Sequence, residues 1–108
     1  RFYSCRNDYA ELYSPAAPLN LSATNISRTG FTLSWEYPFP QPDGFEIQIS
    51  TSSSFTTLVQ SFPDVAADST SLVISGLSRN TRYYVRMRAI NAVGIGPWST
   101  TLQVRTSK

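Results

Sequence analysis

Apolar and polar residues alternate along much of the chain, with the period of two that marks a β-strand with one buried face. In residues 31–37, FTLSWEY, the side chains of Phe31, Leu33 and Trp35 share one face. The same alternation recurs in four more stretches. The side chains expected to point inward there are Phe45, Ile47, Ile49, Leu72, Ile74, Tyr83, Val85, Met87, Ala89, Leu102 and Val104. Proline and glycine separate these runs and suit turns, so the pattern predicts an antiparallel sandwich of short strands.

The length supports one compact domain and not two, since 108 residues with 41% hydrophobic content fill a single core. No apolar run approaches the roughly 20 residues of a membrane helix, so we expect no direct membrane insertion. The nine Lys and Arg residues are scattered along the sequence and the net charge is +2, which argues against nucleic acid as a partner. We interpret the chain as a fragment of a longer protein.

Four segments together resemble a fibronectin type III domain over residues 15–108: PLNLSATNI, the strand centred on Trp35, SGLSRNTRYYVRMRAINAVGIGPWS and the closing LQVRT. The resemblance implies an immunoglobulin-like sandwich of seven antiparallel strands in two sheets, all-β, with Trp35 packed between the sheets. Leu77, Thr81 and Tyr83 are similar to a Leu-x-x-x-Thr-x-Tyr run of the family. Tyr83 is then expected to form a tyrosine corner, with its ring buried and its hydroxyl bonded to nearby backbone.

Arg79 and Asn80 stand where this family often has Pro-Gly. Asparagine tolerates the left-handed conformation that such a turn needs, so we expect the corner to form. Without the proline, the turn is less rigid before folding.

The outward face of the strand that carries Tyr83 is rich in cations. Its expected members are Arg82, Tyr84, Arg86 and Arg88. Trp98 stands where the family frequently has proline, and one hypothesis is that Arg86 or Arg88 stacks on its ring, an arrangement similar to half of the WSxWS element of cytokine receptors. The favoured alternative is a solvated face on which Glu46 supplies a partial counter-charge.

Two loops of the implied fold lie at the same end, YPFPQPDG and NAVGIGP. Tyr37 and Phe39 in the first and Ile95 in the second are candidates for a small apolar patch that recognises another protein. The favoured alternative is that Tyr37 or Phe39 folds back to cap the core. The integrin-binding tripeptide Arg-Gly-Asp is absent, so that function of the family does not transfer.

The residue inventory argues against an enzyme. The chain has no histidine and a single cysteine, so nucleophiles lack the usual base, and we expect neither a metal site nor a cofactor. The seven carboxylates form no convincing acid and base pair. The motif GIG lies between strands, not before a helix, so it does not predict a phosphate site.

Two sequons, at Asn20 and Asn25, make these residues candidates for N-glycosylation. Residues 51–57, TSSSFTT, are interpreted as a loop or a loosely held strand edge without a functional role. Residues 1–14 lie outside the resemblance and are expected to be the tail of a preceding domain or an extension packed on this one. Cys5 has no cysteine to pair with inside the chain. The preferred hypothesis is a disulfide to a cysteine outside the fragment, and the alternatives are a free thiol in a secreted parent or a reduced cysteine in a cytosolic one.

The combined interpretation is a non-catalytic interaction or adhesion module of a larger protein, whose partner is another protein or a neighbouring domain. The alternative is a structural spacer that holds other domains apart, including in a secreted enzyme or an intracellular scaffold. We expect the parent protein to be extracellular or at the cell surface, while an intracellular parent stays open because the fold alone does not place it.

Overall fold

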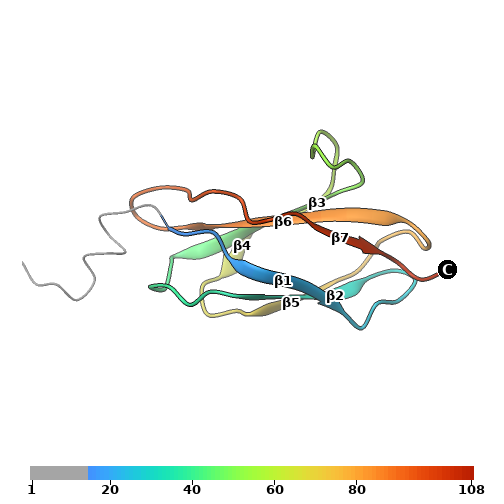
Figure 1. Cartoon of the computed structure of the whole chain (residues 1–108), viewed down its shortest axis with the longest axis horizontal. Coiled ribbons are helices and arrows are strands. Elements are labelled where there is room, and N and C mark those ends of the chain that lie inside the picture. Colours follow the sequence, from blue (N-terminus) through green and yellow to red (C-terminus); the bar gives the residue numbers. More distant parts are fainter. Residues whose placement is uncertain (1–14) are drawn as a thin grey trace, which may run out of the picture.

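The computed structural model describes residues 15–108, which form seven β-strands (Figure 1). Residues 1–14, and with them the expectations for the N-terminal extension and for Cys5, lie outside the described residues. The strands are β1 (Leu19–Thr24), β2 (Phe31–Glu36), β3 (Gly44–Ser50), β4 (Leu58–Ala66), β5 (Ser71–Ile74), β6 (Arg82–Ile90) and β7 (Leu102–Arg105).

The strands form two sheets that face each other. One sheet has three strands in the order β1-β2-β5, and the other has four in the order β4-β3-β6-β7. Every strand pair is antiparallel. The predicted all-β sandwich of seven antiparallel strands in two sheets is therefore confirmed.

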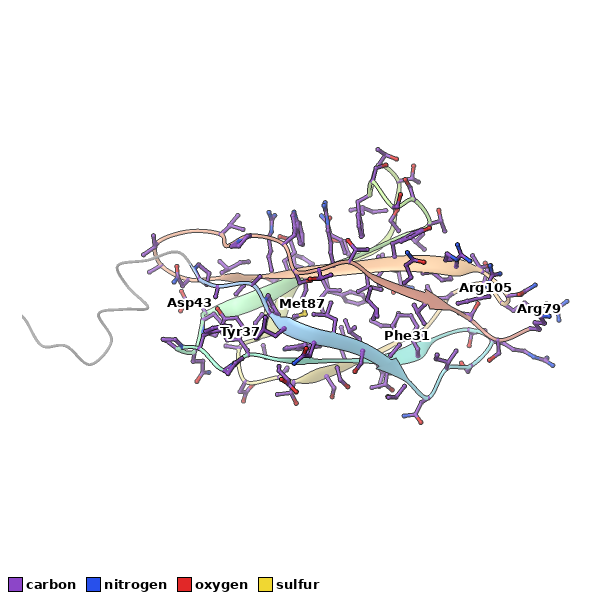
Figure 2. The ribbon with its side chains drawn as sticks, viewed as in Figure 1. Phe31, Tyr37, Asp43, Arg79, Met87 and Arg105 are labelled. Carbon is purple, nitrogen blue, oxygen red and sulfur yellow. The ribbon has the colours of Figure 1, made fainter. Side chains whose placement is uncertain are left out.

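The core lies between the sheets, and the alternation of the sequence accounts for it. In β6, buried residues alternate with exposed or half-buried ones from end to end, and β2 shows the same pattern. Figure 2 shows Phe31 and Met87 pointing into the space between the layers. The fully or almost fully buried apolar residues are Phe31, Leu33, Trp35, Phe45, Ile47, Ile49, Ile74, Leu77, Tyr83, Val85, Met87, Ala89 and Val104.

Leu72 and Leu102 were expected to point inward, and they are only partly buried against the core. They lie on β5 and β7, which are edge strands of their sheets. An edge strand has a neighbour on one side only, so fewer side chains cover its inward face.

Apart from residues 51–57, which project away from the sandwich between β3 and β4, the turns gather at its two ends, because each antiparallel strand returns the chain to the opposite end (Figure 1). The N-terminal pole is formed by residues 15–18, 37–43, 67–70 and 91–97, and the C-terminal pole by residues 25–30, 75–81 and 106–108 (Figure 1). The described chain thus starts at one pole and ends at the other.

Candidate functional site

A stack of rings and guanidinium groups covers the outer face of the four-stranded sheet. The Arg86 guanidinium carbon lies 4.2 Å from the centre of the Phe55 ring and 4.1 Å from the centre of the Trp98 ring. The Arg88 guanidinium carbon also lies 4.1 Å from the Trp98 ring. We call Phe55, Arg86, Trp98 and Arg88 the arginine stack.

The charges of the arginine stack have polar partners on β3, because the register pairs Glu46 with Arg88 and Gln48 with Arg86. Arg88 donates from Nε and Nη2 to Glu46 Oε1 at 2.8 and 2.7 Å. Arg86 donates from Nε and Nη2 to Gln48 Oε1 at 3.0 and 2.7 Å. Both half-buried arginines thus lie over the Trp98 ring, and Glu46 lies beside Arg88 as a counter-charge.

Burial lowers the pKa of the Arg86 guanidinium below its ordinary value, and the charge of Arg88 lowers it further, while Glu46 acts in the opposite direction. An arginine stays charged at neutral pH despite such a shift, so the stacking remains a cation–π interaction there.

Backbone hydrogen bonds along β6 place Trp98 on this face. The Ser99 N–H donates to the Met87 carbonyl at 2.8 Å, and the Met87 N–H donates to Ser99 Oγ at 3.1 Å. The Gly96 N–H donates to the Ala89 carbonyl at 2.9 Å. The segment before β7 thus follows β6 without being a regular strand, and the Trp98 ring lies over the arginines.

Phe55 reaches the stack from the loop between β3 and β4. Ser50 Oγ donates to the Thr57 carbonyl at 2.6 Å and accepts from the Ser52 N–H at 2.9 Å, which closes the loop at its base. Phe55 has a positive φ of 58° and its side chain is 9% exposed. Residues 51–57 are predicted from the sequence to have no functional role, and Phe55 is not among the candidate residues that alternation singles out. The available signal was a lone aromatic residue among serines and threonines.

An aromatic series leads from the core to the surface of the N-terminal pole. The Tyr37 ring packs edge-to-face on the buried Phe45 ring at a centroid distance of 5.3 Å and on the Phe39 ring at 5.2 Å. Tyr37 Oη donates to the Ala16 carbonyl at 3.0 Å. Tyr37 therefore packs against the core, the position that the alternative interpretation of Tyr37 and Phe39 expects. Its ring also contacts Phe39, which is 37% exposed.

Ile95 lies on another loop of the same pole and is 54% exposed. Residues 15–16 touch both loops. The Ala16 carbonyl accepts the hydrogen bond from Tyr37, and the Gly96 backbone lies so close to the Pro15 carbonyl oxygen that a Cβ on Gly96 would overlap it. Residues 15–16 thus run between the loop that carries Phe39 and the loop that carries Ile95.

Phe39 also lines a cleft of about 240 Å³ between two loops of the N-terminal pole. Its other lining residues are Tyr37, Gln41, Pro42, Ala67, Asp68, Ser69 and Thr70. The cleft is shallow and mixed in polarity, with one carboxylate, which suits a small contact with another protein better than the enclosed site of a small molecule.

The residues expected to be structural lie in the core. Trp35 is 3% exposed and packs edge-to-face on Phe45 at 5.8 Å. Leu77 is 5% and Tyr83 2% exposed, and the Ser78 N–H donates to Tyr83 Oη at 2.8 Å. This is the geometry of a tyrosine corner.

Both sequon asparagines have exposed side chains and a positive φ, 55° at Asn20 and 51° at Asn25. Asn20 Nδ2 donates to Glu36 Oε1 at 2.8 Å. Asn25 lies in the turn after β1. A glycan on either side chain would extend into solvent.

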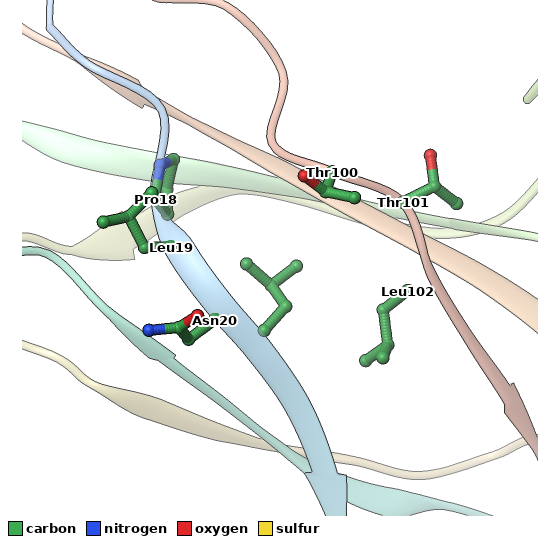
Figure 3. Close-up of a pocket in the computed structure, with 7 residues that line it drawn as sticks. Pro18, Leu19, Asn20, Thr100, Thr101 and Leu102 are labelled. Atoms are coloured by element: carbon green, nitrogen blue, oxygen red, sulfur yellow. The ribbon is translucent and has the colours of Figure 1, made fainter.

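A cavity of about 310 Å³ lies where β1 and the segment before β7 diverge (Figure 3). It is lined by Pro18, Leu19, Asn20, Leu21, Thr100, Thr101 and Leu102. None of these side chains is charged, and no side-chain base lies beside the Thr100 or Thr101 hydroxyl among them.

Within residues 15–108, no three His, Cys, Asp or Glu side chains lie close enough together to hold a metal ion. The same part of the chain has no helix that is long and apolar enough to cross a membrane.

The family model of the fibronectin type III domain matches residues 16–105. The chain belongs to the fibronectin type III family. Curated relatives include contactin-5 of Gallus gallus, 33% identical over 102 residues, and the cell adhesion molecule Dscam2 of Drosophila melanogaster, 35% identical over 98 residues. Receptor-type tyrosine-protein phosphatase F of Danio rerio is 32% identical over 94 residues.

These alignments cover 92%, 82% and 87% of this fibronectin type III chain, but only 10%, 5% and 5% of the three relatives. The chain thus spans a tenth or less of the curated relatives it matches. Among solved structures, the chicken CNTN1 FN1-FN3 domains are 25% identical with a TM-score of 0.75, covering 87% of this chain and 33% of that one. The domain therefore resembles fibronectin type III domains of cell-surface adhesion proteins and receptors.

Proposed function

We propose that this fibronectin type III domain is a non-catalytic protein-interaction module of a larger adhesion protein or receptor, and that its N-terminal pole makes the contact. The observation that carries the proposal is the series Phe45, Tyr37 and Phe39, which fixes an exposed ring on the core by two edge-to-face contacts. A ring held in place before binding loses little conformational entropy when a partner covers it.

The exposed apolar residues of the pole support a protein as the partner. Phe39, Val93 and Ile95 are 37%, 46% and 54% exposed and lie on two loops around the incoming chain. Protein interfaces have apolar and aromatic anchors at their centre and polar residues at their rim. Gln41 and Asp68 beside Phe39 provide such a polar margin.

The proposal is tested with a multivalent form of the chain applied to cells whose surface carries candidate partners. The double variant Phe39→Ala, Ile95→Ala is compared with Val73→Ala, which removes a side chain that is 72% exposed elsewhere on the domain. We expect binding to fall at least tenfold in the double variant and to stay unchanged in Val73→Ala. Equal binding of all three proteins would refute the assignment to the N-terminal pole.

A structural spacer is the second candidate function. It is favoured by the path of the chain, which enters at one pole and leaves at the other, as tandem domains in a row require (Figure 1). A spacer predicts that neither the wild-type chain nor either variant binds any cell surface, even in multivalent form.

A further inference from the structure

The charged side chains of the domain are segregated between the two ends. Five of the cationic side chains lie toward the C-terminal pole and are exposed: Arg28, Arg79, Arg82, Arg105 and Lys108. The acidic residues of the described range are Glu36, Asp43, Glu46, Asp64 and Asp68, and they lie on the other half of the sandwich. Figure 2 shows Arg79 and Arg105 at one end and Asp43 at the other.

Backbone and side-chain contacts join the segments that carry these five cations. Arg82 and Arg105 are directly opposed on neighbouring strands, and Arg105 Nη1 lies 3.5 Å from Asn80 Oδ1. The Asn80 N–H donates to the Ser107 carbonyl at 2.8 Å. Arg28 Nε donates to the Lys108 carbonyl at 3.0 Å, which brings the turn that carries Arg28 to the end of the chain. We call these five residues the basic pole.

Within residues 15–108, no carboxylate side chain forms an ion pair with the basic pole. The salt bridge recorded for residues 15–108 joins Arg88 to Glu46, away from this end. Like charges gathered with few counter-charges repel one another and attract anions from solution. Four of the five cations are arginines, whose planar guanidinium groups can bind sulfate or phosphate oxygens in pairs.

We propose that the basic pole binds a sulfated polysaccharide chain of the extracellular environment. A protein surface fits this pole less well, since Ile26 is its one exposed large apolar side chain within residues 15–108, whereas Phe39, Val93 and Ile95 lie together at the opposite pole. A polyanion needs no apolar centre, because its affinity comes mainly from charge neutralisation and the release of counterions. Anionic lipid is concentrated on the cytoplasmic leaflet, which a domain outside the cell does not meet.

The test uses the full chain, produced without N-glycans so that Asn25 at this pole is unmodified. A heparin-derived decasaccharide is titrated calorimetrically between 50 and 200 mM NaCl, with the chemically desulfated decasaccharide as the control ligand. If three to five cations are neutralised, and each contributes about 0.7 to the slope of log K against log salt, affinity falls by roughly 20- to 130-fold over this range. The desulfated ligand should bind at least tenfold more weakly.

Two matched double variants locate the site. Arg82→Gln, Arg105→Gln removes two charges from the basic pole and should lower the slope by about 1.4 and the affinity at 50 mM NaCl by tenfold or more. The double variant Asp64→Asn, Asp68→Asn changes the net charge by the same magnitude in the opposite direction, at the other end of the sandwich. It should alter the affinity less than twofold. Equal and opposite effects of the two variants would show that net charge alone drives binding, and would overturn the proposal.

Sedimentation of the chain alone at 50 mM NaCl tests the competing outcome, a head-to-tail contact between basic and acidic ends of two copies. Self-association that Arg82→Gln, Arg105→Gln abolishes, without decasaccharide binding by the wild type, would also overturn the proposal. Decasaccharide binding at the basic pole does not depend on the N-terminal pole. The double variant Phe39→Ala, Ile95→Ala should therefore leave it intact whether or not the cell-binding proposal holds.

Discussion

Replacing Arg86 and Trp98 singly and together measures the free energy of their stacking contact. Arg86→Met keeps most of the apolar stem and removes the guanidinium, and Trp98→Leu keeps an apolar side chain and removes the ring. A cation–π pair contributes about 0.5 to 1 kcal/mol when exposed and about 2 kcal/mol when desolvated. Both side chains are half-buried and 4.1 Å apart, so we expect a coupling of about 1 kcal/mol.

Each single substitution should lower the free energy of unfolding by more than the coupling energy between Arg86 and Trp98. Trp98→Leu also removes the contact with Arg88, and Arg86→Met also removes the contacts with Phe55 and Gln48. We expect each to lower the free energy of unfolding by about 1.5 to 2.5 kcal/mol, since each loses two or more interactions of this class. For a domain of this size, 1 kcal/mol corresponds to a change of roughly 4 °C or more in Tm.

The assay is equilibrium unfolding in urea with a common slope for all variants. A second cycle that pairs Arg82→Met with Trp98→Leu is the control, because Arg82 lies at the other end of β6. Distant pairs are additive to within about 0.3 to 0.5 kcal/mol, and we expect that result for the control. A coupling between Arg86 and Trp98 no larger than in the control would refute the idea that the stack stabilises the sheet.

Three other predictions concern the tyrosine corner, the turn at Asn80 and the two sequons. Tyr83→Phe removes the acceptor of a corner hydrogen bond and should lower the free energy of unfolding by about 1 to 1.5 kcal/mol, whereas Tyr84→Phe on the outward face should change it by less than about 0.5 kcal/mol. Asn80 has a φ of 51°, so Asn80→Ala should lower Tm while Asn80→Gly should keep or raise it. In a secretory cell line, glycosidase treatment should remove two glycans from the wild type, and Asn20→Gln and Asn25→Gln should each abolish one, as seen by mass spectrometry. A wild-type chain that leaves these cells without glycans would contradict the last prediction.

Period-two alternation predicted five of the seven strands and most of the core, because burial of one sheet face imposes that period directly. Met87 and Ala89 are fully buried for this reason, and Trp35 occupies the position that the family resemblance implied. The left-handed Asn80 was also predictable, since the residue types that tolerate this conformation are few. Alternation did not predict β4, an edge strand with a single buried residue, where no regular period is imposed.

The arginine stack and the basic pole could not be predicted in full, because alternation along the sequence does not show which distant residues lie together on the surface. Phe55 stands out as a lone aromatic residue among serines and threonines, but its loop has no periodicity that could indicate contact with Arg86. The cations of the C-terminal pole are scattered along the sequence, and the antiparallel topology brings their turns together. Arg28 and Lys108, for example, are 80 residues apart and in hydrogen-bond contact.

The two tryptophans lie in different layers of the domain, so that their fluorescence can report on each layer separately. The indole N–H of Trp35 lies in the core without a hydrogen-bond partner in the described part of the chain, while the Trp98 ring is in contact with two cations. An indole in apolar surroundings and one beside guanidinium groups should emit at different wavelengths. In a Trp98→Phe variant, fluorescence follows the core alone, and the difference from wild type follows the outer face. Loosening of the arginine stack thus becomes visible separately from unfolding of the sandwich beneath it.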